Sequence, residues 1–265
     1  MAALRIPGST LHNRLNDRRR SRSNATKHAP PGTSSAGISV WSSPADGAKG
    51  GGDWCDVVEV SSTLVALTVG DVAGHGDAAN EAMLAVRRSA LQALESMRTP
   101  SEVLAAANTF VAGRFDESIV TAVVAFYDRV QRTLVYANAG HPPPLAVARD
   151  RASFLVPARA DIPLGVYAHH DAQNHAIVLA ADSMLVLYTD GVTERERDPI
   201  RGERELAHAA CLAYGVSDEQ HARAIAECVF RSGRGHDDAA VLVLHTALAE
   251  RRSSARGDRS GFAPA

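Results

Sequence analysis

Lysine, cysteine and long apolar runs are all scarce in this 265-residue sequence. With only Lys27 and Lys49, the chain has no lysine placed for a Walker-type nucleotide site, and neither lysine lies four residues after a tyrosine, as in a short-chain dehydrogenase. The three cysteines, Cys55, Cys211 and Cys228, are isolated and odd in number, which indicates neither a disulfide framework nor a CxxC metal site. A reducing cytoplasm is therefore the expected location.

The sequence also lacks the features of a membrane protein. No apolar run approaches the roughly 18 residues of a membrane span, and the N-terminus has no apolar signal-peptide core. The hydrophobic fraction of 45% and the charged fraction of 22% are typical of a soluble globular protein, and the net charge of -2 indicates neither a membrane nor a nucleic-acid partner. We expect polar tails at 1–36 and 248–265 around one domain at 37–247. The basic run at 14–27 is interpreted as part of a solvated tail, which leaves open contact with an acidic partner or with nucleic acid.

Most of the domain has the pattern of short strands joined as hairpins. Strands are expected at 38–41, 55–60, 64–69, 121–127, 133–138, 145–147, 153–156, 176–179, 184–188 and 239–245. One helix should follow Gly76, a second should begin with a capping box of Thr99 and Glu102, and a third should be capped by Ser217 and Gln220. Hairpins with helices grouped beside them predict an α+β fold with antiparallel sheets.

The glycines Gly70, Gly74 and Gly76 follow the GxxxGxG spacing of a dinucleotide-binding loop, but Asp71 argues against that use. A carboxylate in a phosphate-binding loop would repel the anion, whereas it would suit a cation. The strand pattern supports the second interpretation, because a turn centred on Ser62 places residue 53 opposite Asp71. The sequence therefore predicts a pair of aspartates at one edge of a sheet.

Further aspartates are expected at the same edge. Asp190 follows the strand at 184–188, while Asp237 and Asp238 precede the strand at 239–245. Two carboxylates about 4 Å apart repel each other by roughly 4 kcal/mol near a protein surface, so they must protonate, separate or bind a cation. Oxygen ligands suit Mg²⁺ or Mn²⁺, and two such ions about 3.5–4 Å apart commonly serve phosphoester hydrolysis.

Each motif is weak alone, but seven of them occur in order. They are GGDWCDV (51–57), GDVAGHGDAA (70–79), YANAGHPPPL (136–145), IPLGV (162–166), LYTDGVTE (187–194), RGEREL (201–206) and HDDAAVLVL (236–244). From about Ile38 to Thr246, this series resembles the bacterial SpoIIE-type branch of the metal-dependent protein serine/threonine phosphatases, the PPM or protein phosphatase 2C-like family.

The resemblance implies an α-β-β-α sandwich of two antiparallel sheets with two divalent cations, Mn²⁺ or Mg²⁺, at one end. Asp71 would bridge the ions, and the carbonyl of Val72 would join one of them. Asp190 and Asp237 would bind the other ion, and Asp53 would lie beside the centre, directly or through water. Asp238 is the fallback for Asp237, because the ligand of the family matches the first aspartate of the pair.

The same resemblance implies the activity and a substrate. Water activated by the cations, held chiefly by Asp71 and Asp190 as the catalytic residues, would hydrolyse phosphoserine or phosphothreonine. The expected substrate is a phosphorylated anti-sigma-factor antagonist in bacterial partner-switching signalling. A phosphatase-like binding module without catalysis is the alternative, and the sequence leaves the oligomeric state open.

No general acid can be assigned from the sequence. Animal and plant relatives have a histidine where this chain has Ala73, and His75, His141 and His236 are expected to be loop histidines bonded to neighbouring backbone. The charge-dense segment 193–205 is interpreted as a solvated loop or as a flap over the site.

Overall fold

The computed structural model describes residues 37–44, 51–74, 76–115, 119–149, 151–158, 161–195, 198–233 and 237–246. The tails expected at 1–36 and 248–265 lie outside the described residues, as do His75 and His236.

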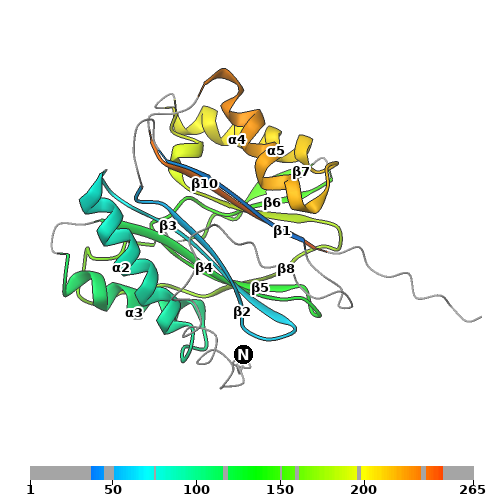
Figure 1. The fold of residues 1–265 in the computed structure, drawn as a ribbon. Helices are drawn as coiled ribbons and strands as arrows, with labels where there is room; N and C mark the ends of the chain where they lie inside the picture. The colour runs from blue at the N-terminus through cyan, green and yellow to red at the C-terminus, as the bar shows by residue number, and fades with distance from the viewer. Residues whose placement is uncertain are drawn as a thin grey trace, which may run out of the picture.

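Two antiparallel sheets of five strands form the centre of the molecule (Figure 1). The first has the order β2-β3-β4-β5-β8, with strands at Trp54–Glu59, Leu64–Val72, Val120–Asp128, Thr133–Ala139 and His175–Val178. The second has the order β1-β10-β9-β6-β7, with strands at Gly37–Ser43, Ala239–His245, Met184–Tyr188, Leu145–Ala148 and Arg151–Phe154. The strands expected from the sequence are all present.

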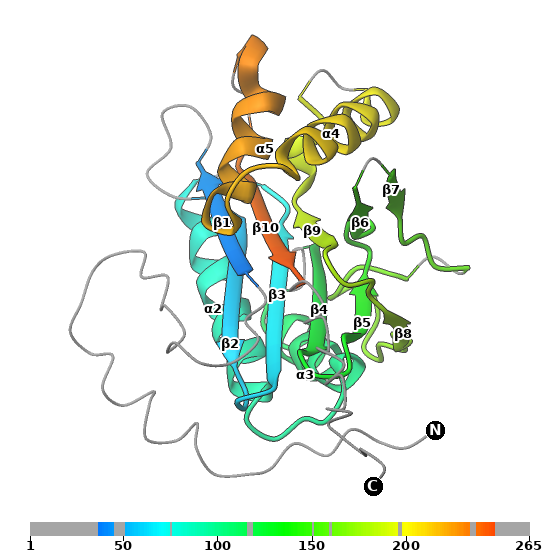
Figure 2. The ribbon, with the colours of Figure 1, turned by 90° about the vertical axis from the view of Figure 1, so that its right-hand side faces the viewer.

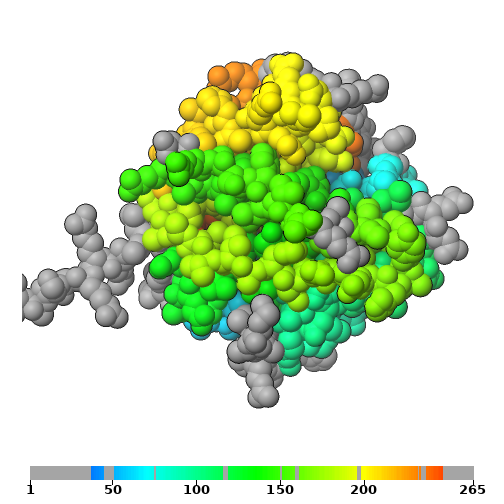
Figure 3. Space-filling view, turned by 180° about the vertical axis from the view of Figure 1, so that it is seen from behind, coloured from blue at the N-terminus to red at the C-terminus, as the bar shows by residue number. Residues whose placement is uncertain are grey.

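Helices cover the outer face of each sheet (Figure 2). Helices α2 (Asp77–Ala93) and α3 (Pro100–Ala112) pack on the first sheet, and α4 (Pro199–Ala213) and α5 (His221–Val229) pack on the second. Figure 3 shows the molecule from behind. In this view α4 is yellow, and the middle of the chain, in green, covers the face below it. The expected α+β fold and its α-β-β-α layering are confirmed.

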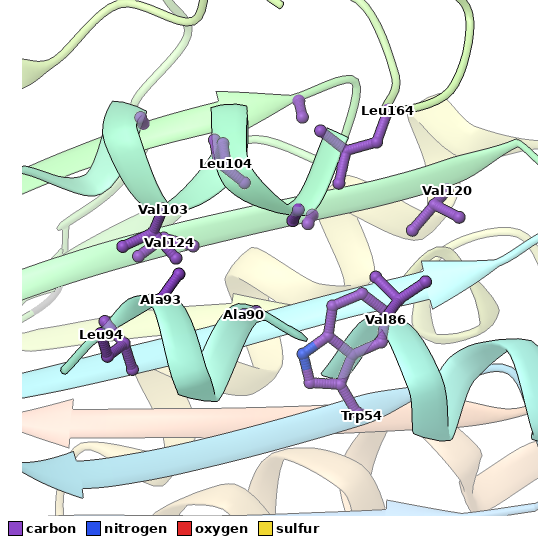
Figure 4. Packing of buried hydrophobic residues seen from close by; sticks show 14 of the residues in the cluster. Trp54, Val86, Ala90, Ala93, Leu94, Val103, Leu104, Val120, Val124 and Leu164 are labelled. Atoms are coloured by element: carbon purple, nitrogen blue, oxygen red, sulfur yellow. The ribbon is translucent and has the colours of Figure 1, made fainter. Parts of the chain in front are cut away.

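Three apolar layers hold the sandwich together. Beneath α2 and α3, Trp54, Val86 and Leu104 pack over the first sheet (Figure 4). Leu67 of β3 and Leu187 of β9 meet between the sheets, and a third cluster lies under α4 and α5. Because the central strands are covered on both faces, they are apolar throughout and do not alternate.

The helix starts agree only in part with the sequence. The capping box of Thr99 and Glu102 is present, with Pro100 in the first turn. The cap predicted at Ser217 is wrong, because its side chain makes no capping hydrogen bond and a 3₁₀ turn at Asp218–Gln220 precedes α5. Helix α4 was not expected, since the charged segment 193–205 was interpreted as a loop or flap.

Candidate metal centre

The first pair of aspartates is positioned by the β2–β3 hairpin. Trp54 pairs with Gly70, and the amide of Val72 donates to the carbonyl oxygen of Gly52 at 3.2 Å, which extends the same register beyond the strand. Asp53 and Asp71 therefore lie opposite each other, as the turn centred on Ser62 predicts.

The second pair of segments comes from the other sheet. Strands β9 and β10 are antiparallel neighbours, and their pairing continues past Tyr188, where the Thr189 amide donates to the Ala240 carbonyl at 3.1 Å. The segments that carry Asp190 and Asp237 are consequently brought to the same edge.

Thr189 joins the two sheets at this edge. Its hydroxyl donates to Asp53 Oδ2 at 2.7 Å and accepts the amide of Ala240 at 2.9 Å. Because both hydrogen-bonding directions of the hydroxyl are used, its position and that of the Asp53 carboxylate are fixed together. Thr189 was not selected from the sequence, where the TDG motif directed attention only to Asp190.

Glycines let the segments approach one another closely. A Cβ at Gly52 would lie 2.4 Å from the Val72 carbonyl oxygen and 2.9 Å from Asp71 Oδ1. A Cβ at Gly191 would lie 1.9 Å from the carbonyl oxygen of Asp238. Any larger residue at either position would fill the space beside the aspartates.

Asp238 has a structural partner at this edge. Its side chain is buried, and its Oδ2 accepts the backbone amide of Gly52 at 2.9 Å. Asp237 is exposed, and its Oδ1 accepts the amide of Asp238. This arrangement accords with the preference for Asp237 over Asp238 as a ligand, although that assignment stays a prediction.

The aspartates form one electrostatic unit. Burial, followed by the negative charge of Asp71, raises the pKa of Asp53 to about 9, although the hydrogen bond from Thr189 opposes both effects. Burial, followed by the charge of Asp190, raises the pKa of Asp71 to about 7. Burial also raises the pKa of Asp190, with added effects from Glu194 and Asp237. The site thus concentrates negative charge that only protons or cations can offset.

The site aspartates do not converge as tightly as the ligands of one compact ion. Among the described residues, the group that brings three candidate ligand atoms within 4.8 Å of one another is Asp218, His221 and His245, at the far end of β10. In the described part of the chain, no three of the site aspartates meet that spacing. This far group cannot be recognised from the sequence, because its members lie on a turn, a helix and a strand.

Of the three loop histidines the structure describes His141, whose ring bonds a side-chain hydroxyl and not the neighbouring backbone that was expected. His141 is buried, its Nδ1 lies 2.8 Å from the Thr121 hydroxyl, and its amide donates to Asn138 Oδ1 at 2.7 Å. His75 and His236 fall outside the described residues. Ala73 occupies the place of the histidine found in animal and plant relatives, so no general acid emerges here.

The charged segment after Asp190 is organised by its own ion pairs. Glu205 of α4 pairs with Arg195 and, one helical turn back, with Arg201. Arg195 also lies over the ring of Phe230, with its guanidinium carbon 5.5 Å from the ring centroid. Whether the segment also acts as a flap over the site stays a prediction.

The layered sandwich with acidic side chains at one edge defines the class of PP2C-like phosphatase folds. A solved structure of the PP2C phosphatase domain and a regulatory fragment of SpoIIE from Bacillus subtilis superposes with a TM-score of 0.71, at 18% identity, over 82% of this chain and 64% of that chain. The family profile of stage II sporulation protein E (SpoIIE) matches residues 61–247. The chain belongs to this family.

Two further relatives are similar in sequence, and one of them has a solved structure that is also similar in fold. The phosphoserine phosphatase RsbU of Bacillus subtilis (strain 168) is 29% identical over 129 residues, which are 48% of this chain and 38% of RsbU. A structure of RsbU and RsbW domains from Mycobacterium tuberculosis matches with a TM-score of 0.72 and 28% identity, over 82% of this chain and 61% of that one. The chain thus spans less than two thirds of these proteins. In its described part, no helix is both long and apolar enough to cross a membrane.

Proposed function

We propose that this protein is a metal-dependent serine/threonine phosphatase. The observation that carries the proposal is the edge where both sheets end, at which Asp53, Asp71 and Asp190 interact through space and a threonine hydroxyl bonds one of them. Membership of the SpoIIE family, with a phosphoserine phosphatase among the relatives, supports the same activity.

The donor set fits hard divalent cations. The groups are carboxylates and one backbone carbonyl, which Mg²⁺ and Mn²⁺ prefer. Burial and the neighbouring carboxylates raise the pKa of both Asp53 and Asp71, and a bound cation would offset both effects. Under this proposal Asp71 would serve both ions, the Val72 carbonyl would help to hold one, Asp190 and Asp237 would hold the other, and Asp53 would lie beside them.

Side chains beside the aspartates would hold the metal-binding groups in place. When bound, two such cations lower the pKa of water and offset charge on phosphoryl oxygens. Thr189 holds the Asp53 carboxylate in one orientation, and Asp238 fixes the Gly52 backbone that faces Asp71. In the described structure no side chain is assigned to protonate the leaving serine, so water would serve that step.

For the substrate we propose a phosphorylated anti-sigma-factor antagonist in partner-switching signalling. The support is the likeness to RsbU and to a structure that contains RsbU and RsbW domains, together with a solved structure described as part of a bacterial stressosome. A cytoplasmic location accords with such a substrate.

Hydrolysis of p-nitrophenyl phosphate and of a phosphoserine protein tests the activity. With Mn²⁺ the wild type should be active, and Asp71→Asn or Asp190→Asn should lower kcat/KM by more than about 100-fold, beyond the loss typical of an outer-shell partner. The matched control is Asp56→Asn, since Asp56 lies on β2 near Asp53 but pairs with Arg87 of α2.

The outcomes separate the competing functions. Retained activity in both Asp71→Asn and Asp190→Asn would refute the site assignment. An inactive but folded and Mn²⁺-replete wild type would instead identify the phosphatase-like binding module without catalysis.

A further inference from the structure

A second cluster of metal-binding side chains lies at the other end of β10. Asp218, His221 and His245 each offer one ligand atom, and these atoms lie within 4.8 Å of one another. His245 is the last residue of β10 and Ala239 the first, so the strand separates this cluster from the site aspartates by about 20 Å at the usual rise per residue. It cannot be part of the proposed phosphatase centre.

His221 is an unpartnered polar group within this cluster. The residue is 1% exposed, and neither of its ring nitrogens has a hydrogen-bond partner in the described part of the chain. Burial, followed by the charge of His245, lowers the pKa of His221, while the charge of Asp218 and the backbone at Val216 and Tyr214 oppose this. A buried neutral imidazole with a free nitrogen is costly unless a ligand satisfies it.

His245 is held as metal-bound histidines usually are. Its Nδ1 lies 2.7 Å from Asp218 Oδ1, and its Nε2 lies 3.2 Å from Asp182 Oδ1. The ring stands at 81° to the ring of His221, with the centroids 5.0 Å apart. Metal-bound histidines commonly bind through one nitrogen while the other bonds a carboxylate, which fixes the tautomer and the ring orientation.

The backbone leaves room for the carboxylate of the cluster. Gly37 pairs with His245 across β1 and β10, and a Cβ at Gly37 would lie 2.4 Å from both Cβ and Oδ2 of Asp218. The side chain of Asp218 is 47% exposed, so an ion can reach it from solvent, whereas His245 is only 14% exposed. The cluster is therefore a partly buried pocket of donors with one open side.

We propose that Asp218, His221 and His245 bind a zinc ion and that Asp182 orients His245. Two imidazoles and one carboxylate suit Zn²⁺, whereas Mg²⁺ and Mn²⁺ prefer all-oxygen sites. Three protein ligands leave one tetrahedral position for water. With zinc bonds of about 2.0–2.1 Å the donors stand about 3.3 Å apart, so no donor pair has to change its separation by more than about 1.5 Å on binding.

Zinc titration of the full-length protein in excess Mg²⁺ tests this site. The parent should be Asp71→Asn, so that the proposed phosphatase centre does not contribute, and it should bind one equivalent of zinc more tightly than about 100 µM. Asp218→Asn and His245→Gln should each weaken zinc binding by at least about tenfold. Gly37→Ala, which keeps every donor but crowds Asp218, should also weaken it.

Glu219→Gln is the matched control, because it removes the same charge from the exposed neighbour of Asp218. It should bind zinc like the parent. Thermal unfolding of each variant shows whether the fold is intact. If His245→Gln fails to fold, Asp218→Asn still tests the site, because the side chain of Asp218 is partly exposed and its substitution disturbs the fold less. The proposal would be overturned if Asp218→Asn bound zinc within twofold of the parent. It would also be overturned if the parent did not bind one equivalent of zinc. His245 would then have only its hydrogen bonds to Asp218 and Asp182. Either result is independent of phosphatase activity.

Discussion

Thr189 connects the two sheets through one hydroxyl group. It donates to Asp53 and accepts from the amide of Ala240. Thr189→Val should cost about 1–3 kcal/mol in the free energy of unfolding, because it leaves the Ala240 amide unsatisfied. It should also raise the Mn²⁺ concentration needed for half-maximal phosphatase activity by about 10–100-fold, as loss of an outer-shell partner does.

A second buried threonine provides the control for that prediction. Thr68 is buried, and its hydroxyl accepts a hydrogen bond from Trp54 Nε1 at 3.2 Å, with no contact to a site carboxylate. Thr68→Val should lower the stability but leave the Mn²⁺ dependence unchanged. Equal Mn²⁺ dependence in both valine variants would show that Thr189 has no role in positioning Asp53.

Burial of His141 makes the stability of the protein depend on pH. Burial lowers the pKa of His141 to about 3 from an ordinary value of 6.5. The unfolded chain therefore binds an extra proton between these values, so the stabilisation by the neutral ring is complete above pH 6.5 and is lost as the pH falls towards 3. The free energy of unfolding should decrease by up to about 1.4 kcal/mol per pH unit through this group.

Chemical denaturation of the wild type and of His141→Gln, at several pH values between 6.5 and 4.5, measures this effect. The variant should show the shallower decrease, whatever its stability at neutral pH. Parallel curves for the two proteins would contradict the prediction and assign the acid sensitivity to other groups.

Helix α4 is packed against the segment that follows Asp190. A Cβ at Gly202 would lie 1.8 Å from the carbonyl oxygen of Thr193. Alanine improves helix propensity by about 1 kcal/mol, yet Gly202→Ala should destabilise the fold by about 1–3 kcal/mol, because the helix must move away from this backbone. Phosphatase activity should fall as well, since the displaced segment carries Asp190.

Gly215→Ala serves as the matched substitution, since a Cβ at Gly215 has no atom within 4 Å. Its free energy of unfolding should stay within about 0.5 kcal/mol of the wild type. Urea unfolding curves of both variants test this prediction. If Gly202→Ala were as stable as Gly215→Ala, the helix could accommodate the added methyl group beside the Thr193 carbonyl without loss of stability.

The sequence contains a start signal for α4, but the many arginines and glutamates of the segment made the helix hard to recognise. Asp198 caps the helix by accepting the amide of Arg201, and Pro199 stands in its first turn. The buried face consists mainly of small residues, Gly202, Leu206, Ala209, Ala210 and Ala213. Alanine contributes little to a hydrophobic period, and so the arginines and glutamates dominated the pattern. The true helix is recognised only from its packing on the second sheet.

The contact between the two sheets contributes to the stability of the whole molecule. Leu187 of β9 is 1% exposed and packs with residues of the first sheet such as Leu67. Leu187→Ala should cost about 2–5 kcal/mol in thermal or urea unfolding, through lost burial and the cavity left behind. Leu212→Ala, at an exposed position of α4, should change the stability by less than about 0.5 kcal/mol.

Contacts between residues close in the sequence could be predicted, whereas contacts between distant segments could not. The β2–β3 register could be predicted from the symmetry about Ser62, because hairpin pairing is local. The meeting of Asp53 with Thr189 could not, since it depends on how one sheet packs on the other. The same holds for Asp218, His221 and His245, which are adjacent only after β1, β10 and α5 have packed together.

The acidic edge draws its members from both halves of the sequence. Asp53 and Asp71 precede the turn between β6 and β7, while Asp190 and Asp237 follow it. A chain divided at that turn would give two fragments with two of these aspartates each, so neither fragment could assemble the edge alone. Recovery of cation-dependent hydrolysis on mixing the fragments would therefore be a direct signal of their reassembly.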